Sequence, residues 1–359
     1  MKKISLILMV AVLVSMLSGC SGGVAYNRFN DTFFDSFDTV TQVIGYTKTQ
    51  EEFDMYMTQI HDRMLELHKM YDKYNDYEGI NNIKTINDNA GKEPVKVSKE
   101  IIDLINFSKE MYYNTNQKTN IAFGAVLRIW SDYRDDAEFD PTNAKIPPME
   151  MLQEASEHTD LEKVIVDEEN MTIFLQDPEM SLDVGAVAKG FATEIIVDEM
   201  VERGFDSWII SAGGNIRAVG EPKDPAKTKW GIGIQNPDKS IFGDGSNILD
   251  TVFMNNISVV SSGDYQRYYV VDDQRIHHII DPETLMPASH YRAINVVIED
   301  SGLADFYSTE VFLLPYEESR ELVESVDGLE AIWVFADGNI EMTEGFMAIS
   351  RSGGAIATD

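Results

Sequence analysis

Residues 181–194, SLDVGAVAKGFATE, combine the residue types that bind phosphate groups. Asp183, Gly185, Lys189 and Gly190 stand just before an apolar run that repeats at helical spacing. The pattern predicts a loop that leads into the N-terminus of a helix. Unpaired backbone N–H groups and the helix dipole favour an anion there, and Lys189 adds a positive charge. A tight turn with a solvated lysine is the alternative interpretation.

Two adjacent histidines occur in residues 275–282, RIHHIIDP. Successive side chains of a strand point to opposite faces, so His277 and His278 are not expected to bind one metal together. We expect one of them to face solvent and the other a cleft. Histidine titrates near neutrality, so His278 is a candidate general base. A structural role in holding the turn at Asp281 is the alternative.

Asp305 and Thr309 are four residues apart in a predicted helix and therefore share one face. A carboxylate and a hydroxyl make a poor zinc site, but hard oxygen ligands suit Mg²⁺. A helix cap or a solvated pair is the alternative interpretation.

The rest of the chain must supply the helices and strands that position these residues. Helical periodicity predicts helices over residues 50–74, 98–113 and 301–314. Residues 211–215 (SAGGN) are interpreted as a glycine turn, and residues 132–148 as a surface excursion. Strands are expected at 33–47, 164–166, 172–175, 207–211, 230–235, 256–261, 265–271, 275–280, 291–298, 331–335 and 340–342. The predicted fold class is α+β, with a mixed, largely antiparallel sheet and packed helices.

The composition excludes some classes of partner. The chain has 359 residues and a formal net charge of −32, so it lacks the basic surface that binds nucleic acid. Basic attraction to an anionic lipid surface is also excluded. A polyanionic ligand would need a local cation, which is either Lys189 or a metal.

The N-terminus has the order of a lipoprotein signal. Two lysines precede an apolar run at residues 4–16, and the sequence LSGC ends at Cys20, the chain's single cysteine. Cleavage before Cys20 would leave a lipid-anchored protein on the outer face of the cell membrane. We therefore divide the chain into a signal peptide (1–19), a lipidated tether (20–32) and one domain (33–359).

The motifs taken together resemble the ApbE-type FAD:protein FMN transferases, over residues 37–343. The most specific match is DVGAVAKGF at residues 183–191. It is supported by SAGGN at 211–215, HIIDPET at 278–284, and Ala304-Asp305 with Ser308-Thr309.

The resemblance implies an ApbE-like fold and specific roles for individual residues. FAD would bind with its pyrophosphate on Mg²⁺, held by the backbone carbonyl of Ala186 and by Asp305 and Thr309. The residues implied to contact FAD are Phe37, Tyr74, Lys118, Thr119, Asn120, Asp183, Lys189 and Ile280. The candidate catalytic residues are Lys189 and His278.

Two positions depart from the family pattern. Leu285 stands where the family commonly has glycine, and residues 117–120 (QKTN) stand where it usually has Gly-x-Phe-Asp.

The expected function is Mg²⁺-dependent transfer of FMN from FAD to a threonine or serine hydroxyl of an extracytoplasmic redox protein, with release of AMP. A Mg²⁺-dependent FAD pyrophosphatase and a non-catalytic flavin- or solute-binding lipoprotein are the alternatives.

Overall fold

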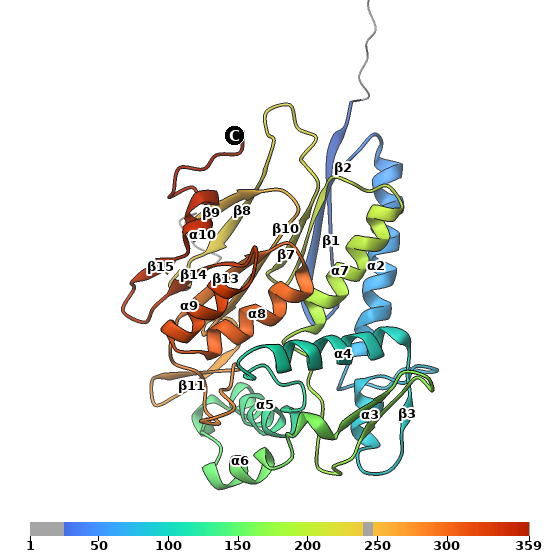
Figure 1. Cartoon of the computed structure of the whole chain (residues 1–359), viewed down its shortest axis with the longest axis vertical. Coiled ribbons are helices and arrows are strands. Elements are labelled where there is room, and N and C mark those ends of the chain that lie inside the picture. Colours follow the sequence, from blue (N-terminus) through green and yellow to red (C-terminus); the bar gives the residue numbers. More distant parts are fainter. Residues whose placement is uncertain (1–24, 240–246, 359) are drawn as a thin grey trace, which may run out of the picture.

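An eight-stranded sheet forms the centre of the computed structural model, which describes residues 25–239 and 247–358 (Figure 1). Its strand order is β1-β2-β6-β7-β10-β13-β14-β15, and every neighbouring pair is antiparallel. The predicted α+β class with a largely antiparallel sheet is therefore confirmed. The strands are β1 (Asn27–Ser36), β2 (Thr39–Thr47), β6 (Trp208–Ala212), β7 (Asn215–Val219), β10 (Ile257–Gly263), β13 (Ala293–Ile298), β14 (Glu330–Val334) and β15 (Ile340–Met342).

Helices cover one face of this sheet, and a second small sheet covers the other. The helices that share the main core with the sheet are α2 (Gln50–Tyr71), α4 (Lys99–Asn114), α7 (Ala188–Glu202), α8 (Ser301–Leu313) and α9 (Tyr316–Ser325). A separate core cluster lies between the sheet and β8 (Trp230–Gln235), β9 (Ile248–Met254) and α10 (Glu344–Ile349). Both faces of the central strands β10 and β13 are therefore buried, as expected for a layered fold, whereas the edge strand β1 is largely exposed.

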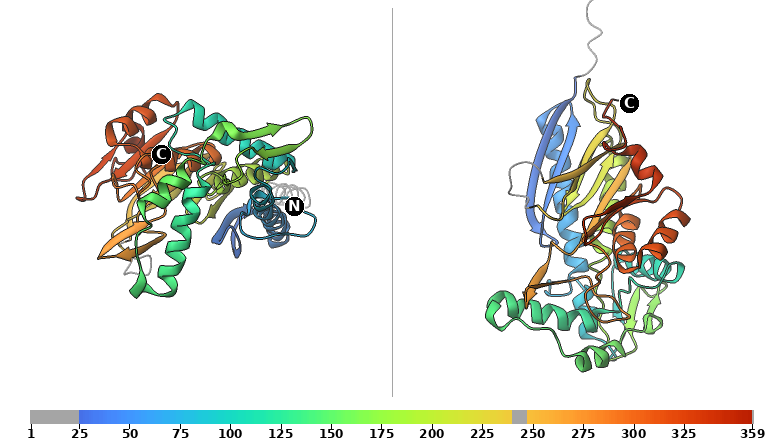
Figure 2. Two further views of the ribbon diagram at one scale, coloured as in Figure 1. Left: turned by 90° about the horizontal axis from the view of Figure 1, so that it is seen from below. Right: turned by 90° about the vertical axis from the view of Figure 1, so that its left-hand side faces the viewer.

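The remaining elements lie at the end of the molecule opposite to the start of β1 (Figures 1 and 2). A third core cluster joins α5 to the hairpin formed by β11 and β12. The elements of this end are α3 (Ile83–Asp88), β3 (Val95–Lys96), α5 (Gly124–Phe139), η1 (Pro141–Asn143), α6 (Met149–Ser156), η2 (Leu161–Lys163), β4 (Val164–Asp167), β5 (Thr172–Leu175), β11 (Tyr268–Val271) and β12 (Gln274–His277).

Among the boundaries that differ from the sequence prediction, three affect how the site is built. Residues 33–47 form a hairpin rather than one strand, because Phe37 and Asp38 turn the chain with φ of 51° at both residues. Strand β1 begins at Asn27, inside the predicted tether, since Phe29 packs on the core. Helix α5 runs to Phe139, so the predicted surface excursion begins within a helix.

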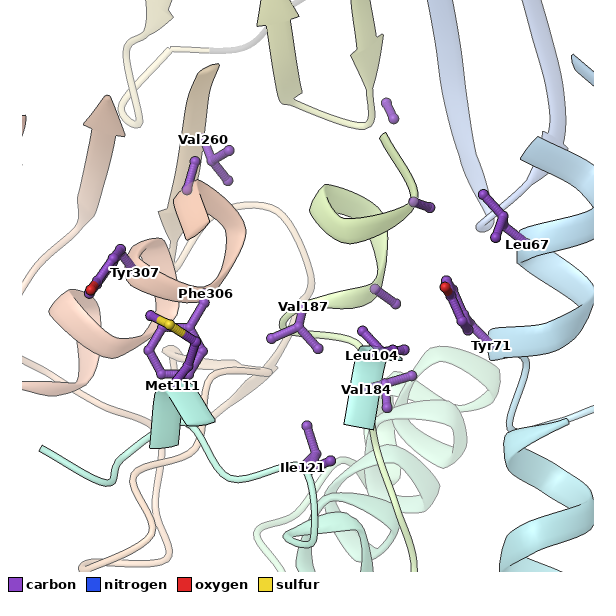
Figure 3. Close-up of a cluster of buried hydrophobic side chains, with 14 of the residues drawn as sticks. Leu67, Tyr71, Leu104, Met111, Ile121, Val184, Val187, Val260, Phe306 and Tyr307 are labelled. Carbon is purple, nitrogen blue, oxygen red and sulfur yellow. The ribbon is translucent and has the colours of Figure 1, made fainter. Parts of the chain in front are cut away.

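The loop before α7, residues 181–187, is called the central loop, and apolar side chains fix it against the main core. Val184 and Val187 are buried and point into the cluster that contains Leu104, Ile121 and Phe306 (Figure 3). Burial of such side chains contributes roughly 1.5–3 kcal/mol each. The loop therefore has a rigid base, while Gly185 and Ala186 between these valines are exposed and half-buried.

The predicted signal peptide and Cys20 lie outside the described residues. Within the described ranges, the helices are all too short or too polar to span a membrane.

Candidate active site

A cavity of about 480 Å³ lies where the central loop meets α8, the β1–β2 turn and the β11–β12 hairpin. Every residue predicted to contact FAD, to bind Mg²⁺ or to act in catalysis lines this cavity. The twelve residues are Phe37, Tyr74, Lys118, Thr119, Asn120, Asp183, Ala186, Lys189, His278, Ile280, Asp305 and Thr309. Their assembly from distant segments is a property of the fold, while their individual roles stay predictions.

The central loop leads into α7 as predicted. Gly185 in the loop and Gly190 in the first turn of α7 have different structural roles. A Cβ added to Gly190 would lie 2.1 Å from the Ser301 carbonyl oxygen, so this glycine is required for α7 to approach α8. The N–H of Gly190 donates to Asp305 Oδ2 at 2.8 Å. That N–H is therefore already paired and is not free for a phosphate. Gly185 meets only the Asp183 side chain, at 3.0 Å, and is the glycine that leaves room for a ligand.

Asp305 and Thr309 lie on one face of α8, and both line the cavity together with Ala186. The Asp305 carboxylate is 4 % exposed, and its Oδ1 lies 3.9 Å from Lys189 Nζ. Burial raises the pKa of Asp305, against the opposing effects of Lys189 and the Gly190 N–H. Its charge therefore lacks full compensation within the described residues.

These three oxygen donors fit Mg²⁺. No group of three His, Cys, Asp or Glu residues that could hold a metal occurs in the described ranges, which argues against an all-protein metal cage there. Mg²⁺ characteristically takes one or two carboxylates and completes its octahedral shell with water and substrate phosphates. A single buried carboxylate, one hydroxyl and one carbonyl beside an open cavity match that requirement.

Lys73 is a cavity residue that sequence reasoning missed. Its Nζ lies 2.5 Å from Asp183 Oδ2, and it lies 4.8 Å from the centre of the Tyr74 ring. Burial alone would raise the pKa of Asp183, but Lys73 and the Gly185 N–H outweigh this effect and lower it. Asp183 is therefore a carboxylate at neutral pH. No local sequence signal links Lys73 to a residue 110 positions away.

The side chains of the loop at residues 117–120 differ in whether their polar atoms already have partners. Lys118 Nζ is paired with Asp281 at 3.1 Å and with Glu283 at 2.8 Å. The Asn120 amide donates to the Thr159 carbonyl and accepts from the Ala122 N–H. The Thr119 hydroxyl is buried and has no hydrogen-bond partner in the described part of the chain. Thr119 is therefore the residue of this loop best prepared to bond a ligand.

Both histidines line the cavity, so the expectation that one faces solvent and the other a cleft is not met. Strand β12 ends at His277, so the alternation of side chains along the strand does not extend to His278. His277 is buried, its Nε2 lies 2.7 Å from the Ala288 carbonyl oxygen, and burial lowers its pKa. His278 is exposed to the cavity, with Nδ1 3.3 Å from the Arg267 carbonyl oxygen. The surrounding chain desolvates His278, and the charges of Arg267 and Lys189 oppose its protonation, so its pKa is lowered. The ring is therefore neutral at pH 7.

Two aromatic residues and one aliphatic residue complete the predicted set. The Phe37 N–H donates to His68 Nδ1 at 3.2 Å, which fixes the turn between β1 and β2. Tyr74 is 59 % exposed, and its N–H donates to the Asp72 carboxylate at 2.6 Å. Ile280 is buried in the wall beside α5. Apolar faces of this kind suit a flavin or adenine ring.

The glycine turn predicted at residues 211–215 is confirmed, and its last residue reaches the cavity. Gly213 and Gly214 have φ of 58° and 92°, which glycine adopts without strain. Asn215 is 1 % exposed, and its Oδ1 accepts a hydrogen bond from Ser301 Oγ at 2.8 Å. Its Nδ2 has no hydrogen-bond partner among the described residues, although it is near enough to lower the pKa of Asp305.

The structure explains how Leu285 replaces the glycine that is common in the family at this position. Its φ is 59°, a conformation that costs a side-chain-bearing residue roughly 1 kcal/mol and that glycine adopts freely. Its side chain is buried in the α5 core, and its carbonyl oxygen accepts from Trp130 Nε1 at 3.1 Å. Packing against α5 thus offsets the backbone strain.

Comparison with known proteins first gives the class of fold. The crystal structure of the ApbE protein from Thermotoga maritima superposes with a TM-score of 0.75, at 26 % identity, over 90 % of this chain and 99 % of that one. The flavin transferase ApbE from Vibrio cholerae has the same fold, with a TM-score of 0.73 at 17 % identity, over 90 % of this chain and all of that one. The ApbE family model matches residues 37–333, and the chain belongs to the ApbE family.

Curated relatives cover most of the chain. A FAD:protein FMN transferase from Treponema pallidum is 30 % identical over 277 residues, which is 74 % of each chain. One from Klebsiella pneumoniae is 28 % identical over 287 residues, covering 78 % of this chain and 85 % of the relative.

Proposed function

We propose that this chain is a FAD:protein FMN transferase that moves FMN from FAD to a threonine or serine hydroxyl of another protein. The main support for this proposal is that all twelve predicted site residues line one cavity. The curated relatives of the chain are named FAD:protein FMN transferase. The hydroxyl oxygen forms a bond to the FMN phosphorus, the pyrophosphate P–O bond breaks, and AMP leaves with the bridging oxygen. Such a transfer depends on positioning and on charge neutralisation.

Asp305, Thr309 and the Ala186 carbonyl would hold Mg²⁺ together with the pyrophosphate. When bound, the metal supplies positive charge to the phosphates. The buried carboxylate of Asp305 supports this assignment because its charge is otherwise poorly compensated. Gly190 fixes the orientation of Asp305 through its N–H.

Lys189 is assigned to the pyrophosphate. Its side chain is 26 % exposed, and its Nζ is not in hydrogen-bond contact with Asp305, which lies 3.9 Å away. The ammonium is therefore available to a phosphate oxygen, where it would stabilise the charge that develops on the departing AMP.

Replacement of Lys189 by methionine, which has a similar length and no charge, tests this role. We expect Lys189→Met to weaken FAD binding about 10- to 100-fold, since a charged hydrogen bond is worth about 1.5–3 kcal/mol. FAD fluorescence titration measures the dissociation constant. Lys229, which does not line the cavity, gives the matched control Lys229→Met. Equal affinities for the two variants would show that Lys189 is only a solvated side chain.

His278 is assigned as the base that takes the proton of the attacking hydroxyl. It faces the cavity and its pKa is lowered, so it is unprotonated at neutral pH and able to accept a proton. Its Nδ1 lies near the Arg267 carbonyl, which favours a proton on that nitrogen and leaves Nε2 as the accepting atom.

An extracytoplasmic location is part of the proposal and follows from the N-terminal sequence that ends at Cys20. The acceptor is then a flavin-carrying redox protein on the outer face of the membrane.

A change of Cys20 to alanine tests the anchoring. We expect Cys20→Ala to move the protein from the membrane to the soluble fraction, because the thiol that carries the lipid is gone. Fractionation without detergent, followed by a transfer assay on each fraction, measures both properties. Retention on the membrane would point to an uncleaved helix instead of a lipid.

FAD hydrolysis is the second candidate activity, because the exposed His278 shows that solvent reaches the cavity. Incubation with FAD and Mg²⁺, with and without an acceptor, distinguishes the activities. Transfer releases AMP only when the acceptor is present, hydrolysis releases FMN and AMP without it, and simple binding releases neither.

A further inference from the structure

Glu310 is a fully buried acid that none of the proposed steps uses. It follows the predicted metal ligand Thr309 on α8, and its exposed fraction is 0 %. Among the described residues, no lysine or arginine forms an ion pair with it. Burial of an uncompensated carboxylate is costly, so its hydrogen bonds must carry the compensation.

Those hydrogen bonds come from the loop at residues 117–120. The Lys118 N–H donates to Glu310 Oε1 at 3.2 Å, and the Thr119 N–H donates to Oε2 at 2.6 Å. Both carboxylate oxygens are therefore used on two consecutive backbone amides. This contact joins residues that lie more than 190 positions apart.

We call these two hydrogen bonds from Lys118 and Thr119 to Glu310 the clamp, and the backbone of the loop requires it. Gln117, just before the clamped amides, has φ of 64°, which costs a residue with a side chain roughly 1 kcal/mol. The side chain of the next residue, Lys118, forms ion pairs with Asp281 and Glu283. Two charge-assisted hydrogen bonds outweigh the backbone cost and hold the strained turn in one conformation.

We infer that Glu310 is a positioning residue that couples the helix bearing Asp305 and Thr309 to the loop bearing Thr119. The clamp sets where the unpaired Thr119 hydroxyl projects into the cavity. The ligand of this hydroxyl is the FAD molecule of the proposed function, on which the inference rests. Glu310 itself does not line the cavity, so it acts through the loop and not on the nucleotide.

The test combines hydrogen exchange with FAD binding in Glu310→Gln. The amide keeps one acceptor oxygen and loses the charge. We expect the peptide with the Lys118 and Thr119 amides to exchange about tenfold faster, as loss of a charged hydrogen bond predicts. The dissociation constant for FAD with Mg²⁺ should rise about tenfold, while kcat at saturating FAD changes less than about threefold. If the glutamine variant does not fold, Glu310→Asp must also speed amide exchange at Lys118 and Thr119 and raise the dissociation constant for FAD, both to a smaller extent.

Glu330 supplies the matched control. It accepts the Phe346 N–H at 3.2 Å and the Thr343 hydroxyl, outside the cavity. Glu330→Gln should speed exchange near Phe346 and leave FAD binding unchanged. Unchanged exchange at Lys118 and Thr119 in Glu310→Gln, or unchanged FAD affinity, would overturn the inference. Failure of the parent protein to bind FAD would instead overturn the proposed function, and the exchange result would still decide whether the clamp exists.

Discussion

Asp305→Asn is expected to reduce Mg²⁺-dependent FMN transfer by at least about 10³-fold, because it removes the one charged ligand of the predicted metal site. A metal ion contributes several kcal/mol to stabilising charge in such a transition state, and each 1.36 kcal/mol changes the rate tenfold. The measurement is a Mg²⁺ titration of the transfer rate. The variant should not recover at high Mg²⁺, since its amide cannot supply the missing negative charge.

The fold should survive this change. The raised pKa of Asp305 means that its charge costs stability at neutral pH, so asparagine should leave the thermal midpoint equal or higher. Asp300→Ala is the control on the same helix, because Asp300 caps α8 through the Leu303 N–H at 2.7 Å. That variant should lose about 1 kcal/mol of stability and keep its Mg²⁺ response. Matching Mg²⁺ curves for Asp305→Asn and the parent would refute the metal assignment.

His278→Asn is expected to lower the transfer rate about 10²–10⁴-fold while FAD affinity is kept. Protonation of His278 would stop it from acting as a base, so the rate of the parent should fall as pH drops through its pKa. Because that pKa is lowered, this acid limb should lie below the ordinary titration range of histidine. The pH dependence of kcat/KM at saturating Mg²⁺ measures it in the free enzyme.

The acid limb should flatten in His278→Asn. Saturating Mg²⁺ matters in this experiment, since it keeps Asp305 ionised and prevents a second acid limb. His277→Asn is the neighbouring control: its buried ring packs against Phe312 and its Nε2 lies beside the Ala288 carbonyl oxygen, so the change should affect stability more than the pH profile. An acid limb that persists unchanged in His278→Asn would exclude this residue as the base.

The sequence was most informative where one segment carries both pattern and chemistry. The helical spacing of α8 predicts that Asp305 and Thr309 share a face, as they do. In the loop before α7, Val184 and Val187 are buried in the core and Asp183 lines the cavity. It was least informative about pairs far apart in the chain. The Lys73–Asp183 and Glu310–Thr119 contacts depend on how helices cross the sheet, which no local pattern encodes.

The β1–β2 hairpin was missed for a different reason. A tight hairpin usually shows Asn-Gly or Asp-Gly, whereas this turn uses Phe37 and Asp38 in the left-handed conformation. Phe37 tolerates that conformation because its N–H is bonded to His68 and its ring contacts Tyr71. Tertiary contacts from α2 therefore supply what the turn sequence lacks.

The most direct test of the account is mass spectrometry of an extracytoplasmic flavin-carrying redox protein after incubation with this chain, FAD and Mg²⁺. The account predicts that the acceptor gains the mass of one FMN on a threonine or serine, with equimolar AMP released. Asp305→Asn, assayed in parallel, should leave the acceptor unmodified. Release of free FMN and AMP with no modified acceptor would contradict the transferase and establish a pyrophosphatase.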